Sequence, residues 1–237
     1  RDLVLSRGLG DVYKRQGYNV VLLDLSPKCL AIARREIRKA GVRYRAKEIV
    51  QGSITDLSRF KNESFDAALC LGPLSHLLEK SEREAAAIEL VRVAKKKAPL
   101  FISACNLYGA FTIALGWHPE ELTDPSHEEI FTKGIHRAHY RNLKEAKRSA
   151  SETDAYFFHP NELEKLFENK GVQTLTLATC QGLSSYLYEA TNLLYKDKEK
   201  WRRWLKLLLQ TCTDPCIIGV GNHLLYVGRK KIGRRYI

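Results

Sequence analysis

The 237-residue chain contains no methionine. Because translation starts at methionine, we expect that Arg1 is not a native start and that the chain is a fragment. The sequence also lacks any apolar run near the roughly 18 residues that a membrane-spanning helix needs, and no signal-peptide pattern opens it. These absences predict a protein without a membrane span that works in the cytoplasm.

Metal-binding motifs are missing as well. The six cysteines form no CxxC pair and no Cys/His cluster, and most lie within apolar runs; they stand at positions 29, 70, 105, 180, 212 and 216. A zinc site needs several such ligands at short, regular spacing. We therefore expect no metal, and we expect reduced, buried thiols of the kind found in cytoplasmic proteins.

Acidic residues are outnumbered, with 27 Asp and Glu against 39 Lys and Arg, for a net charge of +12. A surplus of this sign is a feature of nucleic-acid-binding proteins. The cations are nevertheless spread along the whole chain, and their short clusters lie at residues 95–97 and 229–235. We expect a small-molecule partner, with nucleic acid as the alternative, and the oligomeric state stays open.

The sequence does contain a regular alternation of strand and helix patterns. Apolar, β-branched runs typical of buried strands occupy residues 18–23, 45–50, 64–72, 99–105, 172–180 and 222–230. Helical patterns occupy residues 26–39, 81–94, 159–171 and 185–210. The alternation predicts an α/β fold with a mostly parallel, doubly wound, Rossmann-like sheet over residues 17–237. Residues 106–157 interrupt it, and we expect them to form a helical cap inserted after the strand near 99–105.

Asp24 lies directly after the first apolar run, VVLL, and just before Ser26-Pro27, which predicts a helix start. In nucleotide-binding α/β folds an acid in this place accepts hydrogen bonds from ribose hydroxyls. The alternative is that Asp24 only caps the helix, but Ser26 is the better cap. We expect Asp24 and its neighbour Leu25 to lie at a ribose site.

Two more turns follow predicted strands. In GSITDL, the backbone of Gly52, Ser53 and Ile54 can reach an adenine edge, although this is also the composition of an ordinary polar turn. In CLGPLSHLL, Gly72 and the next proline end a strand and allow a ligand to approach the backbone closely. His76 follows, and the sequence leaves open whether it is a packed histidine or a catalytic base.

The segments VVLLDLSPKCLAIA, QGSITDL, FDAALCLGPLSHLLEKSEREAAAIELVRV and PLFISACN, in this order, resemble successive motifs of class I S-adenosylmethionine-dependent methyltransferases. They are most similar to the small-molecule branch that includes ubiquinone- and biotin-pathway enzymes, and the resemblance extends over about residues 17–230. It implies methyl transfer from S-adenosylmethionine to a small molecule. It also implies that Asp24 binds the ribose, that Ser53 and Ile54 hold the adenine, and that Leu71 and Gly72 lie along the methionine portion.

The beginning of the chain departs from that family. Its first strand and Gly-x-Gly-x-Gly loop should precede Gly17, yet Gly8 and Gly10 are followed by Tyr13 in place of a third glycine. Asp24 comes only 16 residues after Gly8 (24 minus 8), against the roughly 20 expected. Residues 1–16 also resemble a translated sequencing-adapter tail. We expect them to be non-native, the first strand and glycine loop to be missing or replaced, and cofactor binding by this chain to be weak or absent.

Methyl transfer from a sulfonium depends mainly on positioning and on exclusion of water, and a base is needed only where the acceptor must lose a proton. Candidate bases are His76, His139 and Tyr140, with His136 and Tyr108 as further candidates. Three other functions stay open. They are methylation of RNA or protein, a nicotinamide-dependent oxidoreductase on a similar sheet, and an inactive fragment that lacks the cofactor loop.

Overall fold

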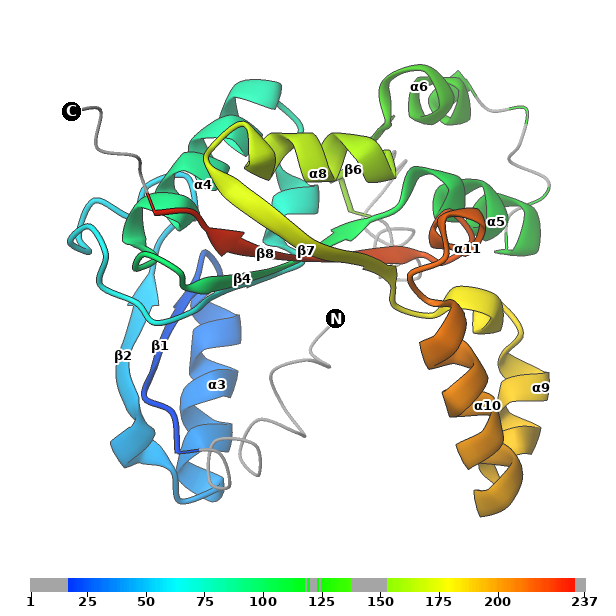
Figure 1. Cartoon of the computed structure of the whole chain (residues 1–237), viewed down its shortest axis with the longest axis horizontal. Helices are drawn as coiled ribbons and strands as arrows, with labels where there is room; N and C mark the ends of the chain where they lie inside the picture. Colours follow the sequence, from blue (N-terminus) through cyan, green and yellow to red (C-terminus); the bar gives the residue numbers. More distant parts are fainter. Residues whose placement is uncertain (1–16, 118, 120–122, 124, 138–152, 233–237) are drawn as a thin grey trace. The chain divides into compact units, whose positions relative to one another are not determined.

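The computed structural model describes residues 17–117, 119, 123, 125–137 and 153–232 (Figure 1). The chain divides into two compact units, Arg1–Ser58 (unit 1) and Arg59–Ile237 (unit 2). The segment 1–16, which we expect to be non-native, lies outside the described residues, as do the candidate bases His139 and Tyr140.

Unit 1 contains β1 (Val20–Asp24), α3 (Pro27–Lys39), the 3-10 turn η1 (Arg43–Arg45) and β2 (Ala46–Gln51). The two strands are parallel, and Asp24 lies opposite Gln51 at their carboxyl ends. Ser26 caps α3 as expected, because its Oγ accepts a hydrogen bond from the Cys29 N–H at 3.3 Å. The turns that follow β1 and β2 therefore leave from the same edge of the pair.

Unit 2 begins with a strand–helix–strand crossover and continues through several shorter elements. In chain order they are β3 (Ala68–Leu71), η2 (Pro73–His76), α4 (Lys80–Val93), β4 (Pro99–Cys105), α5 (Leu107–Trp117), α6 (Pro125–Lys133), β5 (Ile135–His136), β6 (Ala155–Tyr156), α8 (Pro160–Glu168), β7 (Val172–Thr179), η4 (Gly182–Ser184), α9 (Tyr188–Tyr195), α10 (Lys198–Thr211), α11 (Pro215–Ile218) and β8 (His223–Lys230).

Four strands of unit 2 form one sheet in the order β3-β4-β8-β7. β3 and β4 are parallel, whereas β8 runs antiparallel to both of its neighbours. The six predicted strands are present, and β8 is the antiparallel strand of a fold that we expect to be mostly parallel. The single helix predicted over 185–210 is wrong, since Asp197 starts a new helix by accepting the N–H groups of Glu199 and Lys200.

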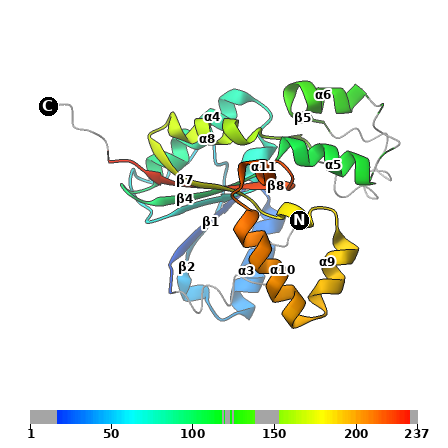
Figure 2. The same cartoon turned by 45° about the vertical axis from the view of Figure 1, so that its right-hand side comes forward.

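One face of this sheet carries the core of unit 2. Alternate residues of the two central strands are buried, namely Leu100, Ile102 and Ala104 of β4 with Leu224 and Tyr226 of β8. The ring of Phe167 from α8 stacks on that of Tyr226 with centroids 5.2 Å apart. Figures 1 and 2 show α4 and α8 on the same side of the strands. Burial alternates along the strands because side chains alternate between the two faces.

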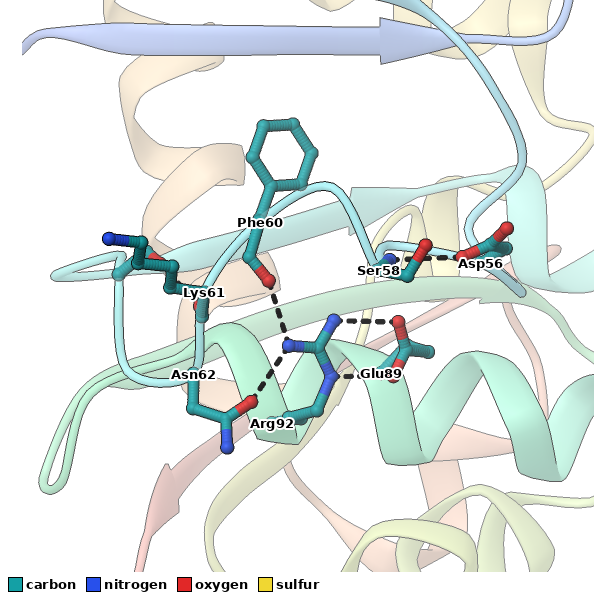
Figure 3. Close-up of polar contacts among 8 residues, drawn as sticks. Asp56, Ser58, Phe60, Lys61, Asn62, Glu89 and Arg92 are labelled. Carbon is teal, nitrogen blue, oxygen red and sulfur yellow. Dashed lines mark hydrogen bonds and ion pairs between the residues drawn. The ribbon is translucent and has the colours of Figure 1, made fainter.

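The loop before β3 is fastened to α4 by one guanidinium group (Figure 3). Arg92 pairs with Glu89 through two hydrogen bonds of 2.6 and 2.8 Å, and it donates to the carbonyl of Phe60 and to the side-chain oxygen of Asn62. A bidentate guanidinium–carboxylate pair fixes both distance and orientation. The contacts of Arg92 are therefore structural, and they hold the entry to β3 against the end of α4.

The expectation that the cysteines are buried is wrong for most of them. Cys70 is buried in β3, but Cys180 and Cys216 are exposed and the other three are half-buried. Cys105 lies on the sheet face opposite the core, Cys212 lies in the turn after α10, and Cys216 lies in α11. A cysteine with apolar neighbours in the sequence is therefore not always buried in the fold.

Asn106, the residue after β4, is a buried clamp in unit 2. Its Nδ2 donates to the carbonyl oxygens of Ile218, Gly219 and Gly221 at 3.1, 3.0 and 2.7 Å. A Cβ at Gly109 would lie 2.7 Å from the Cα of Asn222, so the first turn of α5 packs backbone against backbone there. The carboxyl end of β4, α5 and the start of β8 are thus joined at one point.

We predict that Asn106→Ala lowers the free energy of unfolding by about 2–4 kcal/mol, because one buried and two half-buried carbonyl groups lose their donor. Urea denaturation followed by circular dichroism measures this change. Asn161→Ala is the matched control, since Asn161 is exposed on α8, and it should cost less than about 0.5 kcal/mol. Equal losses in the two variants would contradict the clamp.

Candidate functional site

Five of the predicted cofactor residues lie together at the carboxyl edge of β1 and β2 in unit 1. Asp24 and Leu25 end and follow β1, and Gly52, Ser53 and Ile54 follow β2. The Gly52 N–H donates to the Asp24 carbonyl oxygen at 3.1 Å, which joins the two turns. A side-chain bond adds to this, because Gln51 Nε2 donates to the Leu25 carbonyl oxygen at 3.2 Å.

The carboxylate of Asp24 is oriented by the chain itself. Its Oδ1 accepts a hydrogen bond from the Ser26 backbone N–H at 2.7 Å. Asp24 is half-buried, and none of the ion pairs found among the described residues involves it. One carboxylate oxygen is thus used locally, and the other is left to accept hydrogen bonds from a ligand. Leu25 beside it is 65% exposed, which gives the edge an apolar surface.

The turn after β2 uses its hydroxyl groups internally. Ser53 Oγ lies 2.7 Å from Thr55 Oγ1 and also accepts the Thr55 N–H at 3.2 Å. The Gly52 N–H is already engaged with Asp24, whereas the N–H groups of Ser53 and Ile54 have no partner within the described part of unit 1. Two free backbone donors therefore lie beside the Asp24 edge, and they match the ring nitrogens of a base such as adenine.

Leu71 ends β3, Gly72 follows it, and both belong to unit 2. The Gly72 φ of +112° is one that side-chain-bearing residues rarely adopt, and a Cβ there would meet no heavy atom within 4 Å. Its N–H donates to the Ser103 carbonyl oxygen at 3.3 Å. The backbone at the end of β3 is thus held by β4 on one side and open on the other.

Two of the candidate histidines contact the same stretch of unit 2. His76 Nδ1 lies 3.0 Å from the Asp154 carbonyl oxygen, and His136 Nδ1 lies 3.4 Å from that of Thr153. A carbonyl oxygen only accepts, so each contact assigns the ring hydrogen to Nδ1 and leaves Nε2 as the basic atom. The third described candidate, Tyr108, packs edge-on against the ring of His159, with centroids 5.6 Å apart.

Sequence reasoning missed three residues at the carboxyl end of β4. Cys105 lies directly opposite His223, the first residue of β8, so their side chains share one face of the sheet. Burial raises the pKa of the Cys105 thiol and lowers that of the His223 imidazole. Burial is also the main cause that raises the pKa of Tyr186, with smaller contributions from Tyr188 and Cys105 that place Tyr186 near this pair. The end of β4 therefore gathers an imidazole, a thiol and a phenol.

Tyr186 adopts a strained backbone conformation, with φ of +63°. Its hydroxyl donates to the Gly109 carbonyl oxygen at 3.3 Å, and its ring lies edge-on to that of Tyr188. Bulky residues with positive φ are rare and cluster at functional sites, where the surrounding structure enforces them. His223 is detectable in the sequence as a polar residue at a strand end, but the strain at Tyr186 has no sequence signal.

Within the described ranges, no group of three or more His, Cys, Asp and Glu side chains is arranged to hold a metal ion. In the same residues, no helix is both long and apolar enough to cross a membrane.

A protein-family model described as a methyltransferase domain matches residues 8–102. The matched range includes Gly8 and Gly10, which lie outside the described residues. No curated protein sequence matches the chain.

Solved structures share the fold at low identity. A SAM-dependent methyltransferase from Methanosarcina mazei is 17% identical, with a TM-score of 0.59 over 92% of this chain and 84% of its own. A putative sarcosine dimethylglycine methyltransferase from Galdieria sulphuraria is 13% identical, with a TM-score of 0.53 over 93% and 73%. The [4+2]-cyclase SpnF is 16% identical, with a TM-score of 0.53 over 94% and 71%. The fold is thus the α/β Rossmann-like fold of methyltransferases.

We predict that His223 makes stability depend on pH. Its folded-state pKa lies below the ordinary value of 6.5, so the unfolded chain binds the proton more readily. The stability is complete above pH 6.5 and is lost as the pH falls from there toward the folded-state pKa. His223→Gln cannot titrate, so urea midpoints of the variant should fall less than those of the wild type between about pH 7 and pH 5. Parallel curves would refute this assignment.

Proposed function

We propose that this chain, an S-adenosylmethionine-dependent methyltransferase whose residues 8–102 match the methyltransferase-domain family, transfers the methyl group to a small organic acceptor. The proposal depends on the arrangement of Asp24 and the turn after β2 at the edge of unit 1. The Ser26 N–H binds one carboxylate oxygen of Asp24 and leaves the other available to a ligand. The backbone N–H groups of Ser53 and Ile54 lie beside it without a partner in the described part of unit 1. This donor and acceptor set fits an adenosyl group.

In this proposal, the residues of unit 1 contact different portions of the cofactor. Asp24 accepts hydrogen bonds from the ribose hydroxyls, with Leu25 as the apolar surface beside them. The N–H groups of Ser53 and Ile54 donate to the adenine ring, and Gly52 keeps the turn tied to β1. Leu71 and Gly72 of unit 2 stay predictions for the methionine portion, and the Gly72 backbone is open on one side. When bound, S-adenosylmethionine supplies an electrophilic methyl group on its sulfonium.

The protein's own groups orient the acceptor and, where needed, take its proton. His76 and His136 each have Nε2 available once Nδ1 is bound to a backbone carbonyl group. His223 is a third candidate, because burial lowers the pKa of its imidazole and so favours the neutral form, which can accept a proton. His139 and Tyr140 stay predictions. An acceptor that carries a free electron pair at neutral pH needs none of these bases.

A small-molecule acceptor is supported by the spread of the positive charge along the chain and by one structural neighbour that is described as a sarcosine dimethylglycine methyltransferase. Methylation of RNA is the second candidate, favoured by the net charge of +12. A small acceptor requires enclosure from water, and we propose that residues 106–157 provide it as a cap. We still predict that residues 1–16 lack the family's glycine loop. A cytoplasmic location also stays a prediction.

We predict that Asp24→Ala weakens binding of S-adenosylmethionine by about 1–3 kcal/mol, or roughly 5- to 150-fold in Kd, through lost charge-assisted hydrogen bonds. Saturation-transfer-difference NMR detects even weak binding and gives the Kd by titration. Asp66→Ala is the control, since Asp66 is exposed and pairs only with Lys95 among the described residues. NAD is the comparison ligand and should not compete. An unchanged Kd in Asp24→Ala would remove Asp24 from the site.

We further predict that S-adenosylhomocysteine forms only slowly, because we expect weak cofactor binding, when the chain is incubated with S-adenosylmethionine and a panel of small amines, phenols and carboxylates. Mass spectrometry of both products identifies the acceptor. Bulk RNA and an unstructured peptide are the parallel substrates, and we expect no methylation of either. Methylated RNA, with binding that falls steeply as salt rises, would favour the second candidate.

A further inference from the structure

The helices between β7 and β8 form an addition to unit 2 that its core does not require. β7 and β8 are neighbouring antiparallel strands, which a turn of two residues can join. Instead, residues 180–222 connect them through η4, α9, α10 and α11. No residue of α9, α10 or α11 is buried. Figures 1 and 2 show α9 and α10 side by side, extending away from the end of the β7–β8 pair.

One face of α10 is used to hold this helical hairpin together. Trp204 Nε1 donates to Ser184 Oγ at 2.7 Å, and the Trp201 ring lies edge-on to that of Tyr195 of α9, with centroids 5.4 Å apart. Leu208 reaches Gly182 of η4. These three apolar side chains recur at i, i+3 and i+7, so they lie on a single side of the helix.

A second face of α10 carries cations and leucines together. Its members recur at i, i+4, i+7, i+8 and i+11, which places them on one side of the helix: Lys198, Arg202, Leu205, Lys206 and Leu209. Leu205 is 38% exposed and Leu209 is 73% exposed. We call this set the basic–leucine face.

The cations of the basic–leucine face are not neutralised by the part of the chain that the structure describes. Arg203 and Lys200, on the flank, pair with Glu199 and Asp197 at 2.8 and 3.5 Å. Lys198, Arg202 and Lys206 take part in no ion pair there, and Glu199 is the sole acidic residue of α10. The face therefore joins a concentrated positive charge to exposed apolar area.

We propose that the basic–leucine face of α10 binds an anionic lipid bilayer surface, with its three cations at the headgroup phosphates and its two leucines at the acyl boundary. A helix with cations and apolar side chains on its free surface is suited to lie in the plane of such an interface. Long cationic side chains reach the phosphates while their stems stay in apolar surroundings. Exposed leucines gain nothing from a phosphate backbone in water, so the face fits a bilayer better than a nucleic acid.

The neighbouring helix of the hairpin also exposes apolar side chains. Leu193 and Tyr195 of α9 are also exposed, at 65% and 68%. Tyrosine is favoured where one end of a side chain is apolar and the other is wet, as at a bilayer interface. This proposal rests on unit 2 alone and is independent of the methyl acceptor.

The test is flotation of the purified full chain with lipid vesicles. Vesicles of phosphatidylcholine with phosphatidylglycerol should bind it about tenfold more strongly than vesicles of phosphatidylcholine alone. Arg202→Glu/Lys206→Glu and Leu205→Gln/Leu209→Gln should each weaken binding to the anionic vesicles by about tenfold or more. All four substitutions are at exposed positions, and thermal melts confirm that the variants fold.

Matched controls separate this face from general effects of charge or hydropathy. Lys96→Glu/Lys165→Glu changes the net charge equally at exposed sites of unit 2, and Ile88→Gln/Leu175→Gln removes two other exposed apolar side chains. Both should leave vesicle binding unchanged. Equal losses in the controls would overturn the proposal. Binding to RNA that depends on the cations but not on the leucines would also overturn it. The same holds for a dimer that depends on the leucines and does not bind vesicles.

Discussion

The hydrogen bond from the Ser26 backbone N–H to Asp24 Oδ1 is the constraint on which the functional account depends. It uses one carboxylate oxygen to shape the turn between β1 and α3, and so it presents the other oxygen at the strand edge. The Gly52 N–H bond to the Asp24 carbonyl oxygen brings the next turn to the same place. A fixed carboxylate can accept hydrogen bonds from ribose hydroxyls, and free backbone N–H groups can donate to an adenine ring. We propose that these two contacts in unit 1 prepare both interactions.

A different principle organises unit 2, in which one buried amide joins three elements. Asn106 supplies hydrogen bonds to the chain just before β8, and the lack of a side chain at Gly109 lets the backbone of α5 approach that of Asn222. The carboxyl end of β4 is thereby held rigid where Cys105, His223 and Tyr186 gather. The strained backbone of Tyr186 is stabilised by two contacts of its side chain: its hydroxyl donates to the Gly109 carbonyl oxygen, and its ring packs against that of Tyr188. Rigid support of this kind suits a surface that must orient a reacting molecule.

Sequence patterns predicted the strands and the Ser26 cap because these depend on local composition. The place of Asp24 followed as well, since a buried run ending in an acid before a helix cap is a local signal. Local patterns could not predict the antiparallel direction of β8 or its pairing with β4, because these depend on contacts between residues more than a hundred positions apart. The break at Asp197 was missed because the residues on either side favour helix equally. The strain at Tyr186 and the pairing of Cys105 with His223 arise only from tertiary packing.

The most direct test of the central claim is amide chemical-shift mapping of the isotope-labelled chain titrated with S-adenosylhomocysteine. Within unit 1, we expect the largest shifts at Leu25, Ser53 and Ile54, whose N–H groups lie at or beside the proposed ribose and adenine contacts. The amide of Ser26 should shift too, because its partner carboxylate gains new hydrogen bonds. Titration that moves amides elsewhere while these four stay still would contradict the account.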